Sequence, residues 1–349
     1  MITSLDKLDI VISIYNQEKI IRKVLYGIFA NTTTPFNLIL VFDGCTDKTK
    51  PLALRYIEKY KPKLLQKLIV RDAPNVYETK ANNIGFRLAE KDYMITVQDD
   101  MVVKEKGWEK RLTYPLRKFD DVIAVSSRAA QDIKYIDEKK HIYINRATRE
   151  SDSLSRDIFA VRDVINRGPV AFRMEHLRAI NYLNEKYAPS DLDDADLCLR
   201  VWKERKLRSG AYWINYISRF EWGKTRTKDS TMYTENPIKK NSLQIKKDHG
   251  DYIKSGLKHS KDIFISESEI DYTGETERFK AIRYYPLADT IWGFKVSYQH
   301  IIRTNWHKLR KFIKDKIVTV LEKSGLVNQG DVESLGFKKI IKNKLKNKC

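Results

Sequence analysis

The sequence predicts an α/β fold in which a mainly parallel sheet is flanked by helices, followed by a basic, mostly helical C-terminal extension. In the first 130 residues, short apolar runs rich in β-formers alternate with longer helical patterns, which is typical of βαβ units. The 349 residues are 42% apolar and 11% aromatic, which suffices for a substantial core and excludes a mostly disordered chain. Three widely spaced cysteines without a CxxC pair encode neither a disulfide framework nor a structural zinc site.

The predicted elements follow one another regularly along the chain. We predict strands at 9–14, 37–42, 67–71, 93–97 and 122–125, and helices at 18–31, 47–60, 79–90 and 106–119. Asp47 follows a turn and precedes an apolar helical pattern, which favours a capping role at the second helix. Residues 131–165 are polar and weakly patterned and predict a loop or a short excursion. Helical patterns then return at 174–183 and 193–206.

A change in composition near Asp229 predicts a domain boundary. Beyond it the chain is rich in Lys, Ser, Thr and Asn, and its periodicity weakens. We therefore expect one domain at 1–229 and a C-terminal extension at 230–349.

The positive charge is concentrated near the C-terminus. The formal net charge is +20, and residues 291–349 hold 14 Lys and Arg against 4 Asp and Glu. Residues 291–325 predict a basic amphipathic helix, which is followed by a Lys-rich tail. Such a helix packs on the core with a solvated basic face, or it binds an anionic membrane surface. Nucleic acid is a less favoured partner, because no recognised nucleic-acid motif accompanies the charge.

The sequence also indicates where in the cell the protein is expected to lie. The N-terminus has no pattern typical of a signal peptide, and no apolar stretch reaches the roughly 20 residues that a membrane-spanning helix needs. The few cysteines fit a reducing compartment. We therefore expect a cytoplasmic protein, or one held peripherally at the inner face of a membrane.

Polar residues gather where the predicted strands end. Ser13, Tyr15 and Asn16 lie at the end of the first strand, Asp43 at the end of the second, and 98–100 (Gln-Asp-Asp) after the fourth. In an open parallel sheet, ligands bind beyond the carboxyl ends of the strands. The chain contains neither GxGxxG nor GxxxxGK[ST], which removes the main support for a dinucleotide or P-loop site.

Four segments together resemble a known family. In their order and spacing, DIVISIYNQEKIIRKVL, LILVFDGCTDKT, KANNIGFRLAEKDYMITVQDDM and DLDDADLCLR resemble the family 2 glycosyltransferases of the GT-A fold, over residues 8–226. The resemblance implies inverting transfer of a sugar from a nucleotide-sugar, with a UDP-sugar favoured, in glycan or polysaccharide synthesis. It implies a nucleotide-binding half at 1–130 and an acceptor half at 131–229. The acceptor would be a hydroxyl of a glycan, a lipid-linked molecule or another compound.

The acids after the fourth strand correspond to the DxD motif of that family. By the resemblance, Asp100 is the metal ligand and Asp99 the central residue of the motif, while Gln98 stands where the first Asp is common. A diphosphate donor needs a hard divalent cation, Mn²⁺ or Mg²⁺, which one or two carboxylates can hold together with phosphate oxygens and water. Taken alone, the triplet would equally suit a solvated acidic turn.

The remaining donor residues are also assigned by the resemblance. Asp43 reads the uracil ring, and Ser13, Tyr15 and Asn16 line the same nucleotide pocket. Asn83 faces the donor.

Basic residues are candidates for the diphosphate. Lys80 contacts phosphate or is an ordinary surface lysine. Lys224 and Arg226 help to hold the diphosphate or are surface charges; they stand in a segment where many members carry HxxGxS, and Phe220 takes the place of the His.

A second acidic cluster opens the predicted helix at 193–206. Acids in a first turn complement the helix dipole, and Asp196 with Arg200 makes an i,i+4 pair, so structure alone explains part of it. By the resemblance, Asp194 is the favoured general base and Asp193 the second candidate. An acceptor hydroxyl needs such a carboxylate to take its proton as attack begins.

Two further expectations complete the interpretation. Gly168 and Pro169 resemble the small-residue segment that lines the acceptor side of the donor sugar. The alternative from another class is a non-catalytic protein of the same fold that acts through its basic C-terminus as a membrane-surface or nucleic-acid binding module.

Overall fold

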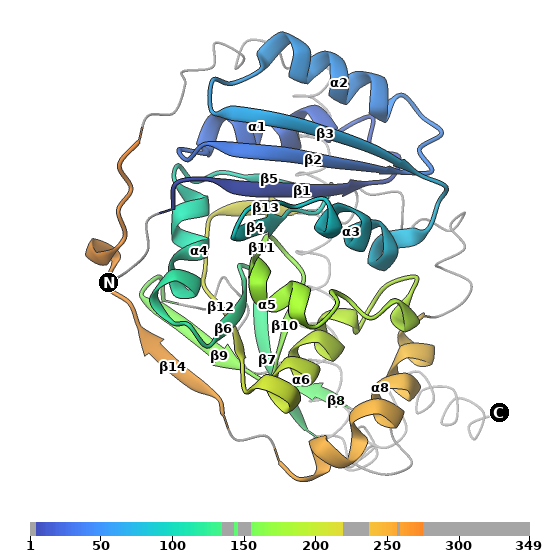
Figure 1. Ribbon diagram of the computed structural model, residues 1–349, viewed down its shortest axis with the longest axis vertical. Coiled ribbons are helices and arrows are strands. Elements are labelled where there is room, and N and C mark those ends of the chain that lie inside the picture. The colour runs from blue at the N-terminus through green and yellow to red at the C-terminus, as the bar shows by residue number, and fades with distance from the viewer. Residues whose placement is uncertain (1–4, 135–142, 146–154, 219–236, 257–258, 275–349) are drawn as a thin grey trace, which may run out of the picture. The chain divides into compact units, whose positions relative to one another are not determined.

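The computed structural model describes residues 5–134, 143–145, 155–218, 237–256 and 259–274. The chain divides into two compact units, Met1–Lys280 and Ala281–Cys349, and the described residues all belong to the first. That unit is built on a nine-stranded sheet with helices on both faces (Figure 1). The predicted α/β class with a mainly parallel sheet is confirmed.

The central sheet combines parallel and antiparallel pairs. Its order is β14 (Lys261–Phe264), β9 (Ile158–Arg162), β12 (Arg208–Ala211), β6 (Val122–Ser126), β11 (Val170–Arg173), β4 (Tyr93–Thr96), β1 (Leu8–Ile14), β2 (Phe36–Asp43) and β3 (Leu65–Ala73). Strands β3, β2, β1 and β4 are parallel, and β11 runs antiparallel between β4 and β6. The five predicted strands are β1, β2, β3, β4 and β6.

Helices cover both faces of the sheet. The helices are α1 (Ile21–Asn31), α2 (Thr49–Tyr60), α3 (Tyr77–Arg87), α4 (Trp108–Lys118), α5 (Met174–Ala179), α6 (Asp193–Arg205) and α8 (Pro237–Lys254), with short 3₁₀ turns η2 (Glu185–Tyr187) and η4 (Glu267–Glu269). One apolar cluster joins the sheet to α1, α2 and α4, and the other joins it to α3, α5, α6 and α8. The first four helices confirm the four predicted from the pattern.

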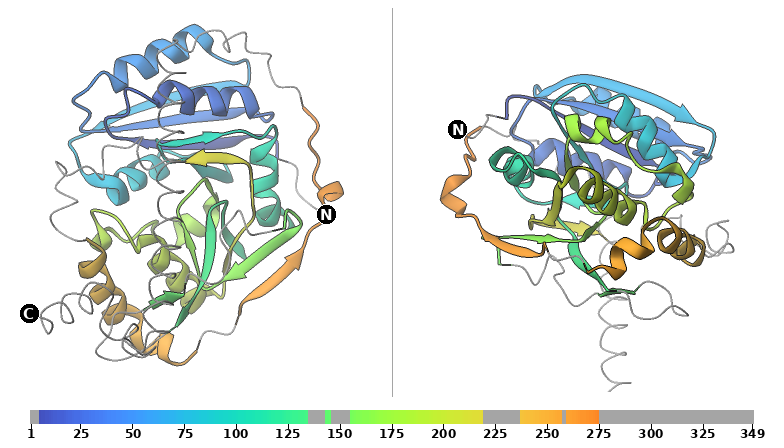
Figure 2. Two further views of the ribbon diagram at one scale, coloured as in Figure 1. Left: turned by 180° about the vertical axis from the view of Figure 1, so that it is seen from behind. Right: turned by 60° about the horizontal axis from the view of Figure 1, so that its bottom comes forward.

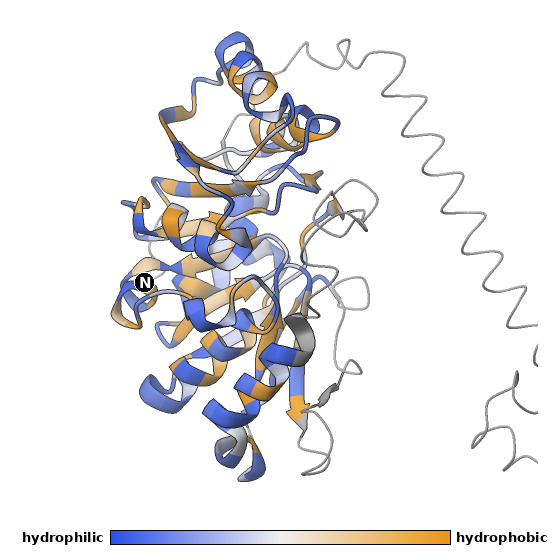
Figure 3. Cartoon of the chain, turned by 90° about the vertical axis from the view of Figure 1, so that its right-hand side faces the viewer, coloured by the Kyte–Doolittle hydropathy of each residue, from blue (hydrophilic) through white to orange (hydrophobic). Residues whose placement is uncertain are grey.

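The apolar pattern of the strands explains the layers. In β1, Ile10 and Ile12 pack into the first cluster, while Val11 between them packs into the second. A strand buried on both faces therefore reads as a continuous apolar run. The helices instead alternate hydrophobic and hydrophilic residues, as Figure 3 shows, because each buries one side.

The prediction that residues 131–165 form no regular structure is wrong for the part of this segment that the structure describes. Small strands lie there: β7 (Ala129–Lys134) pairs with β8 (Tyr143–Asn145) and with β10 (Val164–Asn166), and β9 joins the main sheet. These strands are short, and their backbone pairs with distant segments, so their local pattern is weak. Another small sheet, β5 (Met101–Val103) with β13 (Tyr216–Ser218), packs beside α1.

The compact unit extends beyond the boundary predicted near Asp229. Strand β14 pairs antiparallel with β9, and α8 buries Ile245 and Ile253 in the second cluster. Figure 2 shows α8 beside α6. The predicted basic helix at 291–325 lies outside the described residues. Among the helices that the structure describes, none is both long and apolar enough to span a bilayer.

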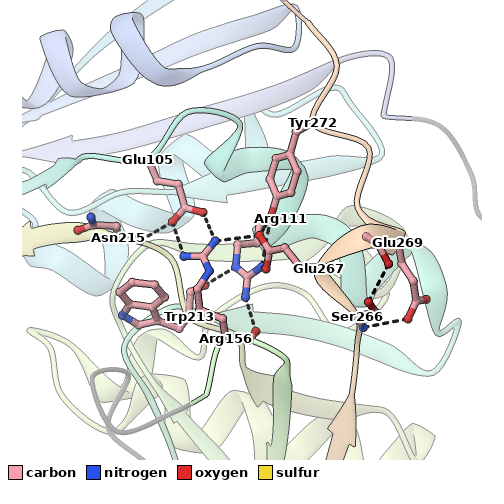
Figure 4. Close-up of polar contacts among 10 residues, drawn as sticks. Glu105, Arg111, Arg156, Trp213, Asn215, Ser266, Glu267, Glu269 and Tyr272 are labelled. Carbon is pink, nitrogen blue, oxygen red and sulfur yellow. Dashed lines mark hydrogen bonds and ion pairs between the residues drawn. The ribbon is translucent and has the colours of Figure 1, made fainter.

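A buried arginine attaches the segment after β14 to the core. Arg111 of α4 is fully buried, stacks 4.2 Å from the ring centre of Tyr212 and pairs with Glu267. Arg156 pairs with both Glu105 and Glu267, at 2.7 and 3.0 Å, and Figure 4 shows these side chains converging. The segment around η4 is therefore held by charge-assisted hydrogen bonds from elements far away in the sequence.

Candidate active site

The loops after β1 and β4 meet at Asp99. Its two carboxylate oxygens accept hydrogen bonds from the backbone N–H of Tyr15, at 2.8 Å, and from Nε2 of Gln17, at 3.1 Å. Burial, and after it the charge of neighbouring Asp100, holds the pKa of Asp99 well above its usual value. The structure thus brings together Tyr15, Asp99 and Asp100, as expected for loops at the carboxyl edge of a parallel sheet.

Asn16 joins the loop after β1 to the loop after β2. Its Oδ1 accepts hydrogen bonds from the backbone N–H groups of Thr46 and Asp47, at 2.8 and 3.2 Å. Its own φ is 51°, a left-handed conformation that Asn tolerates better than most residues. Asp47 in turn accepts the N–H of Thr49, the first residue of α2, at 2.9 Å, so it supports the start of the helix, although the N-cap residue itself is Lys48.

Asp43, at the end of β2, holds the start of α3. Its oxygens accept the N–H groups of Val76, at 2.6 Å, and Tyr77, at 2.8 Å. Burial raises the pKa of Asp43, and these two hydrogen bonds oppose the rise. The side chain is only 4% exposed, but each carboxylate oxygen keeps a second lone pair, and the nucleobase contact stays a prediction. Ser13 lies nearby and donates to Oδ1 of Asn82 at 2.8 Å.

Asn83 has a different role from the one expected. The side chain is fully buried, its Nδ2 donates to the carbonyl of Leu183 and to Oε1 of Glu185, and its Oδ1 accepts the N–H of Leu183. Both ends of the amide are therefore used inside the protein. We correct the donor-facing assignment: Asn83 fastens α3 to the segment at 183–185. Lys80, one turn earlier, is exposed.

The two acids that open α6 have different environments. Asp193 is fully buried, its Oδ1 pairs with Arg167, and its Oδ2 accepts a hydrogen bond of 2.7 Å from Thr79 Oγ1. Because both oxygens are engaged and covered, Asp193 is not retained as a candidate base. Asp194 is partly exposed and accepts the N–H groups of Arg167 and Ala195, at 3.1 and 2.8 Å.

The electrostatics of Asp194 suit proton transfer. Burial, and after it the negative charge of Asp193, raises the pKa of Asp194 to about 7, although Arg167 opposes the rise. A general base works best when its pKa lies near the operating pH, because it is then both ionised and basic enough. Asp194 therefore has a pKa suited to a general base at neutral pH. Asp193 is fully buried, so an acceptor hydroxyl cannot reach it.

One carboxylate links the two acidic segments. Oε1 of Glu78 accepts a hydrogen bond of 2.8 Å from Nε2 of Gln98 and lies 3.0 Å from Nη1 of Arg167. Gln98 directly precedes Asp99 and Asp100, and Arg167 contacts the start of α6. The two acidic segments, about a hundred residues apart in the sequence, therefore converge on the same side chain.

Glu78 and Arg167 were not among the predicted site residues. An acid in the first turn of a helix looks like an ordinary response to the helix dipole, which hides a tertiary role for Glu78. Arg167 directly precedes Gly168 and Pro169, which were predicted to line the acceptor side of the donor sugar. A cationic side chain next to that segment was the sequence signal that could have identified it.

The Gly168–Pro169 turn packs tightly against the end of β6. A Cβ on Gly168 would lie 2.8 Å from the Cβ of Arg128, and the carbonyl of Pro169 accepts the N–H of Ser127 at 2.9 Å. The turn therefore fixes the backbone of Arg167 beside α6. Lys224 and Arg226 lie outside the described residues.

The carboxylates can serve a hard cation bound to a diphosphate. Within the described ranges, no group of three or more His, Cys, Asp and Glu could hold a metal ion unaided. Mg²⁺ and Mn²⁺ bound to nucleotides need only one or two carboxylates, the other ligands being phosphate oxygens and water. Asp100, partly exposed beside Asp99, fits that donor set.

Comparisons with known proteins identify a family for part of the chain. The family described as "Glycosyl transferase family 2" matches residues 9–182. No curated protein sequence matches the chain.

Solved structures resemble the chain more distantly. They include a mannosyltransferase, PcManGT from Pyrobaculum calidifontis, in complex with GDP-Man and Mn²⁺, at 17% identity and a TM-score of 0.43 over 59% of this chain and 54% of that one. Residues 1–349 of S. aureus TarS in complex with UDP-GlcNAc match at 16% identity and a TM-score of 0.46, over 69% and 66%. A longer TarS structure matches at 17% and 0.41, over 61% of this chain and 36% of that one. The chain thus spans about half of that mannosyltransferase and about a third of the longer TarS. From the match over residues 9–182, the chain belongs to glycosyl transferase family 2.

Proposed function

We propose that the protein is an inverting, divalent-metal-dependent glycosyltransferase that moves a sugar from a nucleotide-sugar, a UDP-sugar, to an acceptor hydroxyl. The observation that carries the proposal is the convergence of the two acidic segments on Glu78, through Gln98 on one side and Arg167 on the other. It supports one reaction centre with a donor side at Asp99–Asp100 and a base at Asp194.

Asp194 acts as the general base in this proposal. The acceptor oxygen attacks the anomeric carbon, and its proton passes to the Asp194 carboxylate. The bond from that carbon to the diphosphate breaks as the new carbon–oxygen bond forms, and the nucleoside diphosphate leaves with the electron pair. A single in-line displacement inverts the anomeric centre. Because the pKa of Asp194 is about 7, a large fraction of the base is ionised at neutral pH.

The donor side is proposed from the loops at the carboxyl edge of the sheet. Asp100 would hold a divalent cation, with Asp99 beside it, and the bound cation would neutralise charge on the leaving diphosphate. Asp99 is already fixed by Tyr15 and Gln17, so its position is set before the donor arrives. Asp43, held at the start of α3, is proposed to read the uracil ring.

The diphosphate and the cellular setting are further parts of the proposal. Lys80 is exposed on α3, two residues after Glu78, and is proposed to contact phosphate together with Lys224 and Arg226. The acceptor is proposed to be a molecule that is extended during glycan or polysaccharide synthesis. The basic segment 291–349 is proposed to hold the enzyme at an anionic membrane surface on the cytoplasmic side.

A donor panel tests the proposal. UDP-, GDP- and other nucleotide-sugars are incubated with the protein and Mn²⁺, Mg²⁺ or a chelator, and released nucleotide is measured. We expect release from a UDP-sugar that requires metal and is lost in both Asp100→Asn and Asp194→Asn. Asp92→Asn, an exposed acid outside the site, is the matched control and should behave as wild type. Equal release in the wild type and in the two site variants, or full activity with chelator, would overturn the proposal.

A further inference from the structure

Helix α8 packs against the helix that bears the proposed base. It contacts α6, and the two helices lie side by side in Figures 1 and 2. Both helices lie outside residues 9–182, the part of the chain that matches the family. The contacts made by α8 are therefore features of this chain beyond the matched region.

Asn241 of α8 holds the loop that precedes α6. Its side chain is fully buried, and Nδ2 lies 2.7 Å from the carbonyl oxygen of Tyr187 and 2.8 Å from those of Ser190 and Asp191. Because carbonyl oxygens only accept hydrogen bonds, the amide nitrogen and not the amide oxygen must face them. The side-chain oxygen is buried without a hydrogen-bond partner among the described residues, so the amide serves this loop alone.

The loop needs such support because its backbone is strained. Asp191 and Leu192 have φ values of 70° and 64°, a left-handed conformation that is unfavourable for residues other than glycine, most of all for Leu. Asp193 and Asp194 follow directly. The direction in which the loop enters α6 therefore decides where the Asp194 carboxylate lies.

A second contact from α8 fixes α6 itself. Nε2 of His249 lies 2.8 Å from Oδ1 of Asp196, both side chains being buried, and the other oxygen of Asp196 accepts Nε of Arg200 at 3.1 Å. Asp196 is two residues after Asp194. The helix and its entry loop are thus both held by α8, at points on either side of the proposed base.

We propose that Asn241 and His249 are positioning residues for the glycosyl transfer reaction, and that α8 fixes Asp194 in the place where it meets the acceptor hydroxyl. The inference rests on the proposed role of Asp194 as the base. It assigns a catalytic purpose to a helix beyond the predicted domain boundary near Asp229.

The expected signature is a loss of turnover without a loss of donor binding. In Asn241→Ala, three carbonyls lose their common donor and the loop relaxes. A displacement of about 1 Å in a reacting group costs on the order of a hundredfold in rate, so we expect kcat to fall about ten- to a hundredfold. The dissociation constant of UDP with Mn²⁺, measured by calorimetry, should stay within about twofold, because the proposed metal and nucleobase contacts come from the loops after β4 and β2.

A matched variant separates positioning from general stability. Asn37→Ala also removes a buried amide, whose Nδ2 donates to Asp9 at 2.8 Å, but it lies at the start of β2, far along the strand from Asp43. Thermal unfolding gives the folded fraction of each variant, and kcat is then compared per folded molecule. Equal effects on kcat from both variants, or a parallel loss of UDP binding in Asn241→Ala, would overturn the inference.

His249 provides an independent test if Asn241→Ala does not fold. His249→Gln can still donate to Asp196 and should retain most of the turnover, whereas His249→Leu should lose it. Equal turnover in these two variants would contradict the inference. Asp194→Asn, measured beside them, separates the two proposals: wild-type turnover in Asp194→Asn refutes the base, while an inactive Asp194→Asn with a fully active Asn241→Ala refutes only the role of α8.

Discussion

Replacing Arg167 by Met tests the electrostatics of the site in two ways. The guanidinium pairs with the fully buried Asp193 and with Glu78, and its own side chain is only 12% exposed. Its removal leaves Asp193 as a buried charge without its cationic partner, which costs about 3–5 kcal/mol of folding free energy. The same change removes the positive charge that opposes the rise in the pKa of Asp194.

The second effect has a definite sign. The pKa of Asp194 is raised to about 7 with Arg167 in place, so without it the pKa should rise further, by roughly one unit or more. Less of the base is then ionised at neutral pH, and the acidic limb of the pH dependence of kcat should move to higher pH by the same amount. At pH 7 this lowers kcat about fivefold or more, and part of the loss returns at pH 9.

Urea unfolding and a pH profile of kcat measure the two effects. Arg87→Met is the matched control, because Arg87 pairs with Glu185 at 3.1 Å on the surface, where an ion pair contributes less than about 1 kcal/mol. The double variant Arg167→Met/Asp193→Asn removes the stranded charge and should recover much of the stability. An acidic limb that stays in place or moves to lower pH would refute the reasoning, as would a loss of stability equal to that of the control.

Two predictions concern other titratable groups. Burial raises the pKa of Asp163 from 3.8 to about 7, so the folded state keeps a proton that the unfolded state loses, and wild-type stability should fall as pH rises from about 4 to 7. In Asp163→Asn the side-chain carbonyl can still accept the N–H of Ile133. Urea unfolding should therefore show the variant to be more stable than the wild type by up to about 4 kcal/mol above pH 7 and by little below pH 4. A difference in stability that does not depend on pH would contradict this. Burial raises the pKa of the partly exposed Cys45 thiol to about 11, so alkylation followed by mass spectrometry at pH 8 should leave it largely unmodified, and rapid labelling would disprove the assignment.

Local patterns were sufficient to predict the centre of the fold. Strands buried on both faces, such as β1 and β2, give continuous apolar runs, and the polar residues after them fall at the sheet edge because parallel strands end there together. This is why Tyr15 and Asp99 were placed correctly at one edge. The short strands at 129–166 were missed because their stability comes from pairing with distant strands.

Side-chain roles that depend on long-range contacts could not be predicted. Nothing in the pattern around Asn83 shows that its amide will bond the backbone a hundred residues later, at Leu183. Similarly, Asp193 and Asp194 are adjacent carboxylates in one acidic run, but the Arg167 guanidinium and the Thr79 hydroxyl both engage the carboxylate of Asp193. The sequence supplied the acidic cluster, and tertiary packing decided which acid stays accessible.

The central claim is that Asp100 and Asp194 act on one donor, the first through a cation on the diphosphate and the second through the acceptor proton. Crystals grown with UDP and Mn²⁺ test it most directly, because anomalous scattering locates manganese without reference to the chemistry. The account predicts a manganese peak about 2 Å from a carboxylate oxygen of Asp100, touching the diphosphate, with Asp194 lining the same cavity. A peak bound elsewhere, or an Asp194 carboxylate turned away from the nucleotide, would contradict it.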